Sequence, residues 1–260
     1  MQNVLEKIAE STRARVAAQK QRVSFAALRQ QTAASSPAPS FCAALRAPGL
    51  SLICEVKKAS PSKGMIVKDF PYLQIAQEYE TAGAAVISVL TEPAFFRGSD
   101  AYLREIATQA HIPCLRKDFI VDAYQIYEAK VLGAAAVLLI CALVGPRQLT
   151  EYIALARSLG MDALVETHNP DEIAMALEAG ADVIGVNNRD LRTFEVRLDT
   201  CLQLKALVPG DKIFVAESGI ASPADTRRLL NAGVDAALIG ETLMRADDKS
   251  KMIGALRWPN

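Results

Sequence analysis

The chain has 260 residues, of which 51% are hydrophobic and 22% charged, values ordinary for a globular protein with a sizeable core. Lysine plus arginine equals aspartate plus glutamate, at 29 each, so charge gives no reason to expect a nucleic-acid or membrane-surface partner. The five cysteines are odd in number and widely spaced, and the two histidines lack ligand-like spacing. We therefore predict neither a disulfide framework nor a metal site.

The N-terminus carries acids and bases throughout and lacks the apolar core of a signal peptide. The longest uncharged run, residues 131–146, is too short to cross a bilayer and contains two glycines. We expect a soluble, cytoplasmic protein. The sequence leaves the oligomeric state open, and a monomer is compatible with it.

Residues 3–30 are predicted to form one helix, with Asn3 as its cap, Glu6 completing a capping box, and an apolar face. A stretch rich in Ala, Ser and Pro follows at residues 31–40 and predicts a loop, before a short helix over residues 41–46. We expect residues 1–49 to be a helical extension packed on the rest. Because of the break at 31–40, one hypothesis is that the first helix is a mobile lid.

From residue 50 onward one unit recurs: a short apolar run, a loop, a segment of helical periodicity, and the next apolar run. The runs cover residues 52–56, 85–90, 112–115, 135–140, 163–165, 183–186, 213–216 and 236–239. Glycines precede most runs, and each suits the left-handed residue that ends a helix: Gly83, Gly133, Gly160, Gly180 and Gly233. Helix-capping residues are predicted at Ser99, Asp122, Asn169 and Ser222.

Continuous apolar strands favour a parallel sheet that is buried on both faces. Eight strand–helix units in one chain predict a (β/α)8 TIM barrel, an α/β fold, over residues 50–260 as a single catalytic domain. An open doubly wound sheet is the alternative, but no Gly-x-Gly-x-x-Gly follows the first run.

In such a barrel the functional residues lie at the carboxyl ends of the strands. Polar residues occupy these positions in several units: Glu55, Lys57, Lys117, Glu166, Asn187, Arg189 and Glu217. Glu55 and Lys57 are two apart on one strand, so both point into the barrel. They could be a structural ion pair, but convergence with Lys117 on one mouth favours an acid–base or anion-binding site.

Two glycine-containing loops resemble the phosphate sites common after the last strands of these barrels. They place Ser218 and Gly219 after the seventh strand, and Gly240 and Glu241 after the eighth. Tight turns explain most such glycines singly, but two in the expected units favour a phosphate site. Apolar residues near the mouth predict a substrate with an aromatic part, although each could be ordinary packing: Pro61, Phe96, Phe119, Leu138, Ile140 and Leu191.

Five segments together resemble the indole-3-glycerol phosphate synthase family: EVKKASPSKG at 55–64, LRKDFI at 115–120, VNNRDL at 186–191, VAESGI at 215–220 and LIGE at 238–241. The resemblance covers nearly the whole chain and includes the helical extension. It implies closure of the indole ring from 1-(2-carboxyphenylamino)-1-deoxyribulose 5-phosphate in L-tryptophan biosynthesis, with loss of carbon dioxide and water. It implies no metal or organic cofactor, and a phosphorylated small-molecule substrate; it leaves open whether there is a partner enzyme.

The resemblance also implies roles for individual residues. Lys117 would be the general acid, Glu166 the general base, and Lys57, oriented by Glu55, a binder of anionic groups and a second acid. The remaining positions would complete the site: Asn187 and Glu217 in the catalytic set, Arg189 and Ser60 on polar groups of the substrate, Ser218, Gly219, Gly240 and Glu241 on phosphate, and the six apolar residues around the anthranilate ring. A phosphosugar aldolase or isomerase with a Schiff base on Lys117 and a non-catalytic phosphate-binding protein are the alternatives.

Overall fold

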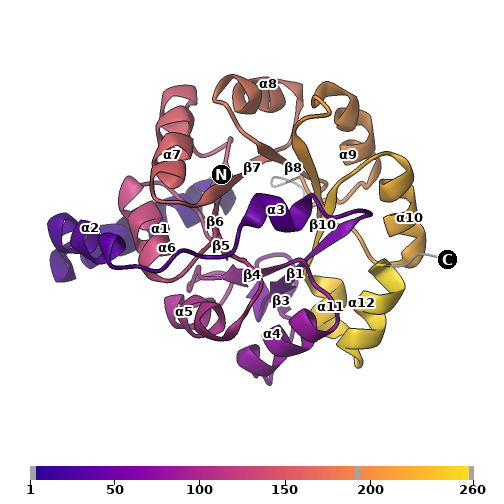
Figure 1. The fold of residues 1–260 in the computed structure, drawn as a ribbon, viewed down its shortest axis with the longest axis horizontal. Helices are drawn as coiled ribbons and strands as arrows, with labels where there is room; N and C mark the ends of the chain where they lie inside the picture. Colours follow the sequence, from indigo (N-terminus) through magenta and orange to yellow (C-terminus); the bar gives the residue numbers. More distant parts are fainter. Residues whose placement is uncertain (1–3, 191–193, 258–260) are drawn as a thin grey trace.

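The computed structural model describes residues 4–190 and 194–257. Eight parallel strands form a closed barrel in the order β1-β10-β9-β8-β7-β6-β5-β4, with helices around its outside (Figure 1). The barrel strands are β1 (Ser51–Val56), β4 (Val86–Leu90), β5 (Cys114–Lys117), β6 (Ala136–Ile140), β7 (Asp162–Thr167), β8 (Val183–Asn187), β9 (Ile213–Glu217) and β10 (Ala236–Ile239). A small antiparallel hairpin, β2 (Ala59–Ser60) and β3 (Gly64–Met65), lies in the loop after β1. The predicted TIM barrel is confirmed.

The helices are α1 (Val4–Arg22), α2 (Phe25–Ala33), α3 (Phe41–Leu45), α4 (Tyr72–Thr81), α5 (Asp100–Gln109), α6 (Ala123–Val131), α7 (Pro146–Ser158), α8 (Pro170–Glu178), α9 (Asp199–Leu204), α10 (Pro223–Asn231), α11 (Glu241–Arg245) and α12 (Lys249–Arg257), with a 3-10 turn η1 (Lys205–Leu207). In the part of the chain that the structure describes, none of them combines the length and apolar character needed to span a membrane.

The local signals in the sequence mark the element boundaries well. All five predicted glycines adopt positive φ values, between 70° and 93°, and each follows a helix as expected. The four predicted caps are also confirmed, because Ser99, Asp122, Asn169 and Ser222 each accept a backbone N–H of the first helical turn.

The prediction of one helix over residues 3–30 is wrong. The chain breaks at Val23 and Ser24, and the Ser24 hydroxyl accepts from the Ala27 amide to begin a second helix, α2. A serine followed by helix-forming residues is itself a capping signal, and the continuous helical pattern concealed it. The loop therefore begins after α2, and the short α3 follows as predicted. The placement of the extension's boundary at residue 49 stays a prediction.

The strands separate two apolar cores. Residues pointing outward, such as Cys54 and Val89, pack against the helices. Residues pointing inward, such as Ile53 and Leu164, fill the barrel together with Phe41 and Leu45 of α3. The helix α3 lies across the amino-terminal end of the barrel (Figure 1), so it closes the end opposite to the mouth.

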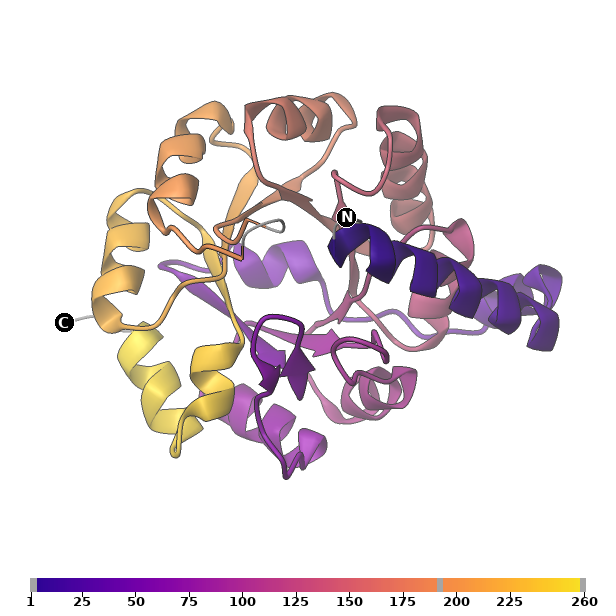
Figure 2. The same ribbon diagram turned by 180° about the vertical axis from the view of Figure 1, so that it is seen from behind.

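The amino-terminal end of helix α1 lies over the other end of the barrel, and the rest of the helix extends to one side (Figure 2). Its Leu5 and Ile8 are buried, and Arg15 donates to both carboxylate oxygens of Asp118 at 2.8 Å. Asp118 directly follows β5, so this ion pair ties α1 to the strand that carries Lys117. The first helix therefore lies over the mouth, and its mobility stays a hypothesis.

We predict that Phe41→Ala destabilises the protein by about 3–5 kcal/mol, because it empties a fully buried position at the closed end of the barrel. Urea denaturation would measure this loss. Leu230→Ala on α10, where the side chain is 40% exposed, is the control and should change stability by less than about 0.5 kcal/mol. Equal losses in the two variants would contradict the role of α3.

Candidate active site

A cavity of about 580 Å³ opens at the carboxyl ends of the strands. Every predicted site residue that the structure describes lines it: Glu55, Lys57, Ser60, Pro61, Phe96, Lys117, Phe119, Leu138, Ile140, Glu166, Asn187, Arg189, Glu217, Ser218, Gly219, Gly240 and Glu241. Leu191, the remaining predicted residue, lies outside the described residues. These residues thus come from all eight barrel strands or the loops that follow them, but they share one chamber.

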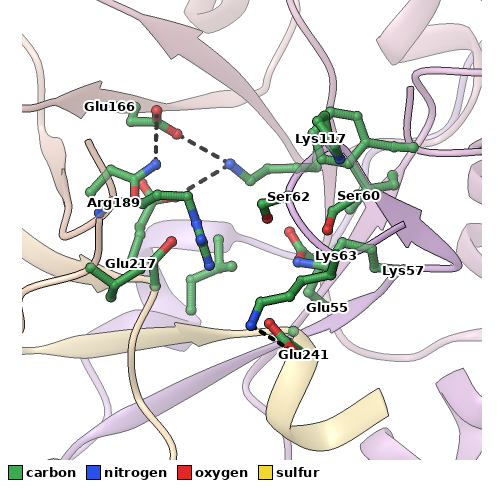
Figure 3. Close-up of a pocket in the computed structure, with 18 of the residues that line it drawn as sticks. Glu55, Lys57, Ser60, Ser62, Lys63, Lys117, Glu166, Arg189, Glu217 and Glu241 are labelled. Carbon is green, nitrogen blue, oxygen red and sulfur yellow. Dashed lines mark hydrogen bonds and ion pairs between the residues drawn. The ribbon is translucent and has the colours of Figure 1, made fainter. Parts of the chain in front are cut away.

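Lys117 lies at the centre of this chamber, between two carboxylates (Figure 3). Its ammonium donates to Glu166 Oε2 at 3.2 Å and to Glu217 Oε2 at 3.3 Å. Glu166 also accepts from the Asn187 amide at 3.2 Å. These residues lie at or next to the last positions of β5, β7, β8 and β9. Because the strands form a closed barrel, residues from distant parts of the sequence meet there.

The charges around Lys117 fix its protonation state. Burial alone would lower the pKa of Lys117, but Glu217, Glu166 and Glu55 outweigh burial and raise that pKa above its usual value. Lys117 is therefore an ammonium ion at neutral pH and can donate a proton. A Schiff base needs a neutral amine, which this surrounding disfavours.

The two carboxylates that share Lys117 differ in acidity. Burial raises the pKa of Glu217, to about 7, because Lys117 offsets burial only in part and Glu166 adds a second negative charge. The pKa of Glu166 is lowered despite burial, because Lys117 and His168 stabilise its ionised form. Two acids held close together with separated pKa values are a common arrangement for proton transfer.

Glu55 and Lys57 form an ion pair on the inner face of β1, as their spacing predicted. Gly240 makes room for this pair, because a Cβ atom there would collide with the Glu55 carboxylate and lie 2.8 Å from Lys57 Nζ. The absence of a side chain at position 240 therefore leaves the space that this ion pair occupies.

The loops proposed for phosphate lie beside this pair. Ser218 and Gly219 both adopt positive φ, at 66° and 78°, and Gly240 precedes the first turn of α11. Glu241 Oε1 accepts a hydrogen bond from Arg245 Nε at 3.1 Å, and it lies 3.6 Å from Nζ of Lys63 in the hairpin loop. Lys63, which the sequence did not single out, therefore reaches across the mouth (Figure 3).

The apolar wall of the cavity includes an aromatic pair. The ring centroids of Phe96 and Phe119 lie 5.7 Å apart. Leu138 and Ile140 project inward from β6. Helix α1 adds Val4, Leu5 and Ile8 to the lining. None of these three was predicted as a site residue. In the sequence these residues form an ordinary apolar helix face. The pattern is the same whether such a face packs on the core or covers a site, so the sequence could not show which.

Gly185 and His168 also support the centre of the site without having been predicted. A Cβ atom at Gly185 would collide with the Glu217 carboxylate, so this glycine admits a buried acid. A glycine inside a strand often marks a place where another group approaches the backbone closely. Gly185 lies inside an apolar run, so the sequence did contain this signal. Nε2 of His168 lies 3.4 Å from Glu166 Oε1.

A model of the family described as indole-3-glycerol phosphate synthase matches residues 5–256. The chain belongs to this family. Proteins named indole-3-glycerol phosphate synthase are 49% identical to it in Lachnoclostridium phytofermentans, 50% in Ruminiclostridium cellulolyticum and 51% in Endomicrobium trichonymphae. Each alignment covers 98% of this chain and at least 98% of the relative.

Membership of the indole-3-glycerol phosphate synthase family decides among the activities considered above. The chain is a carboxy-lyase that closes the indole ring in L-tryptophan biosynthesis, acting on a phosphorylated small molecule. A solved 3-hexulose-6-phosphate synthase from Salmonella typhimurium has a TM-score of 0.66 at 15% identity, over 80% of this chain and 97% of that one. At that identity the likeness supports the barrel alone.

We predict that the stability gap between Glu217→Gln and the wild type depends on pH. The pKa of Glu217 rises from an ordinary 4.5 to about 7 on folding, so its ionisation opposes the folded state. The wild type should lose stability relative to Glu217→Gln as the pH rises from about 4.5 to about 7.

Urea denaturation at several pH values would measure this gap, with Glu151→Gln as the control for loss of an exposed carboxylate. A stability difference that stays constant, or a wild type that gains stability relative to Glu217→Gln as the pH rises, would contradict the raised pKa of Glu217.

Proposed function

We propose that Lys117, Glu166 and Lys57 carry out the proton transfers of the indole-3-glycerol phosphate synthase reaction. The reaction joins the anthranilate ring of 1-(2-carboxyphenylamino)-1-deoxyribulose 5-phosphate to its ribulose carbonyl, and then releases carbon dioxide and water. It therefore requires an acid near a carbonyl, a base for the dehydration, and cations for a carboxylate and a phosphate.

Lys117 is the general acid in this proposal. Its ammonium ion lies at the centre of the cavity, and the paired carboxylates keep it charged. As the ring carbon attacks, a proton from Lys117 neutralises the charge that develops on the carbonyl oxygen. The ammonium ion of Lys117 between Glu166 and Glu217, in the chamber of a family member, is the main support for this role.

Glu166 is the general base of the dehydration. Its lowered pKa keeps it ionised at neutral pH, and contacts with Lys117 and Asn187 fix the direction of both carboxylate oxygens. Glu217 holds Lys117 from the other side. Its higher pKa limits the negative charge next to Glu166.

The cationic and apolar walls orient the substrate. Lys57, held by Glu55, faces the carboxylate that leaves as carbon dioxide and can serve as a second acid, while Arg189 and Ser60 complete the polar wall. Backbone amides around Gly219 and Gly240 bind the phosphate with Ser218 and Glu241. The Phe96–Phe119 wall, with Pro61, Leu138 and Ile140, encloses the anthranilate ring.

The proposed catalytic set lies on one chain, which supports a monomer as a sufficient catalytic unit. All five cysteines are free, and four of them are buried. Reduced, buried thiols support a cytoplasmic location.

We predict that Lys117→Ala lowers kcat by about 10²–10⁴-fold, the usual contribution of a positioned acid. The assay follows the fluorescence of indole-3-glycerol phosphate when purified protein receives the substrate without added metal. Lys58→Ala is the matched control, because Lys58 packs over the Phe70 ring outside the proposed set.

The control variant should retain near-wild-type activity. Full activity in Lys117→Ala would contradict the role of Lys117. Reduction with borohydride should leave no substrate bound to the wild-type chain, and a covalent adduct on Lys117 would contradict the acid role and support a Schiff base.

A further inference from the structure

The loop between β4 and α5 folds around a buried carboxylate. Glu92 lies two residues after the end of β4 and is 1% exposed. Its Oε2 accepts from the backbone N–H groups of Phe95 at 2.7 Å and Phe96 at 3.0 Å, and its Oε1 accepts from that of Ala94 at 3.0 Å. Three consecutive backbone amides therefore converge on one side chain.

This carboxylate is more than the loop itself requires. Among the described residues, the three amides are the only hydrogen-bond or ion-pair partners of the Glu92 carboxylate. Burying a carboxylate without a cation is costly. The loop also exposes Pro93 and Ala94, so water could satisfy its amides instead. A buried acid here is best explained by the need to hold the loop in one conformation.

The rest of the loop closes back on β4. The N–H of Gly98 donates to the carbonyl oxygen of Glu92 at 2.8 Å. A Cβ atom at position 98 would lie 2.4 Å from the carbonyl oxygen of Leu90, so a side chain there would collide with the strand. Arg97 adopts a φ of 56°, which is uncommon for a residue other than glycine. The backbone is therefore constrained on both sides of Phe96.

Phe96 carries the effect of this loop into the active site. Its ring and that of Phe119 lie with their centroids 5.7 Å apart and their planes at 37°, and both residues line the cavity. Glu92 lies behind this wall and outside the cavity lining. It therefore acts on the site only through the backbone that carries Phe96.

The facing ring is held in the same way. Asp118 Oδ1 accepts from the backbone N–H of Phe119 at 2.8 Å, and the Gln125 amide donates to the carbonyl oxygen of Phe119 at 3.1 Å. Asp118 and Gln125 are both buried. The Thr91 hydroxyl, next to Glu92 in the chain, donates to Asp118 Oδ2 at 2.8 Å. Buried polar groups thus fix both loops and tie one to the other.

We propose that Glu92 is a positioning residue for recognition of the substrate's aromatic ring. It fixes the backbone of residues 94–96 so that Phe96 stands opposite Phe119 before the substrate arrives. This inference rests on the proposed function, in which these two rings enclose the anthranilate ring.

The role of Glu92 is to prepare the wall for binding. A wall that is already ordered loses little conformational freedom when the ring enters, whereas a loose loop would have to be ordered at that moment. The contact with the ring is the same before and during the reaction, so it contributes to binding and little to the chemical step. Loss of Glu92 should therefore weaken substrate binding and leave proton transfer at Lys117 nearly unchanged.

The variant that tests this is Glu92→Gln. Its side chain has nearly the same size, but its single oxygen can replace only one of the two carboxylate oxygens, and its NH2 group then faces a backbone N–H. We expect KM to rise roughly tenfold while kcat changes by less than about twofold. Glu92→Asp draws the carboxylate back by one carbon and should also raise KM, so it keeps the test open if Glu92→Gln does not fold.

Inorganic phosphate separates ring recognition from a general disturbance of the site. As a competitive inhibitor it occupies only the phosphate loops, so its inhibition constant should change by less than about twofold in the Glu92 variants. Equal weakening of substrate and phosphate binding would overturn the proposal. A lower melting temperature with a wild-type KM would reduce Glu92 to a role in stability and would overturn it as well.

Glu151→Gln, which changes an exposed carboxylate on α7, is the matched control and should leave KM, kcat and phosphate inhibition unchanged. Phe96→Ala is measured beside it. If Phe96→Ala raises KM and the Glu92 variants do not, the positioning role is overturned while the aromatic wall remains. If Phe96→Ala keeps a wild-type KM, the proposed wall fails and this inference fails with it. A raised KM in both, with unchanged phosphate inhibition, supports the proposal.

Discussion

Two buried carboxylates share one lysine at the mouth of the barrel, and the rest of the site depends on this arrangement. Glu166 and Glu217 lie almost fully buried, and Lys117 is their common cation. Charges in such a place are stable only when they are paired and hydrogen-bonded. The barrel meets this requirement by ending β5, β7 and β9 at the same level, so that a lysine and two acids far apart in sequence meet. The resulting field keeps the lysine protonated and separates the pKa values of the two acids.

The strand that carries Lys117 is fixed from its outer side as well. Arg116, which is fully buried, points away from the barrel and donates to Asp100, Asp118 and Glu128. Asp118 in turn accepts from Arg15 of α1. Side chains alternate between the faces of a strand, so consecutive residues anchor β5 to the helices and supply the acid. Breaking one partner of such a buried network is costly, which links the helical extension to the position of Lys117.

The sequence predicted the barrel because each of its signals repeats. Apolar runs, glycines such as Gly133 and caps such as Asn169 recur in several units and agree with one another. The site residues on strands could be predicted from their positions alone, because a polar residue at the carboxyl end of a buried barrel strand points to the active site. Other contributions were not predictable, because they depend on packing between distant elements. The break at Ser24, the Arg15–Asp118 pair and the face of α1 over the mouth are of this kind. His168 was considered only as a possible metal ligand, although it stands two residues after Glu166 and four residues before Glu172 in the sequence.

Lys117 is held as an ammonium ion at the centre of the site, and this can be measured by titrating Lys117 itself. The protein would be labelled with ¹³C at the lysine ε-carbon, and the Lys117 signal assigned by its loss in Lys117→Met. We predict that this signal keeps the shift of a protonated lysine through neutral pH and up to at least about pH 10, near the ordinary lysine pKa. A Lys117 signal that titrates near pH 7 would show a neutral amine in the resting site, and Lys117 would then not be held as an ammonium ion by Glu166 and Glu217.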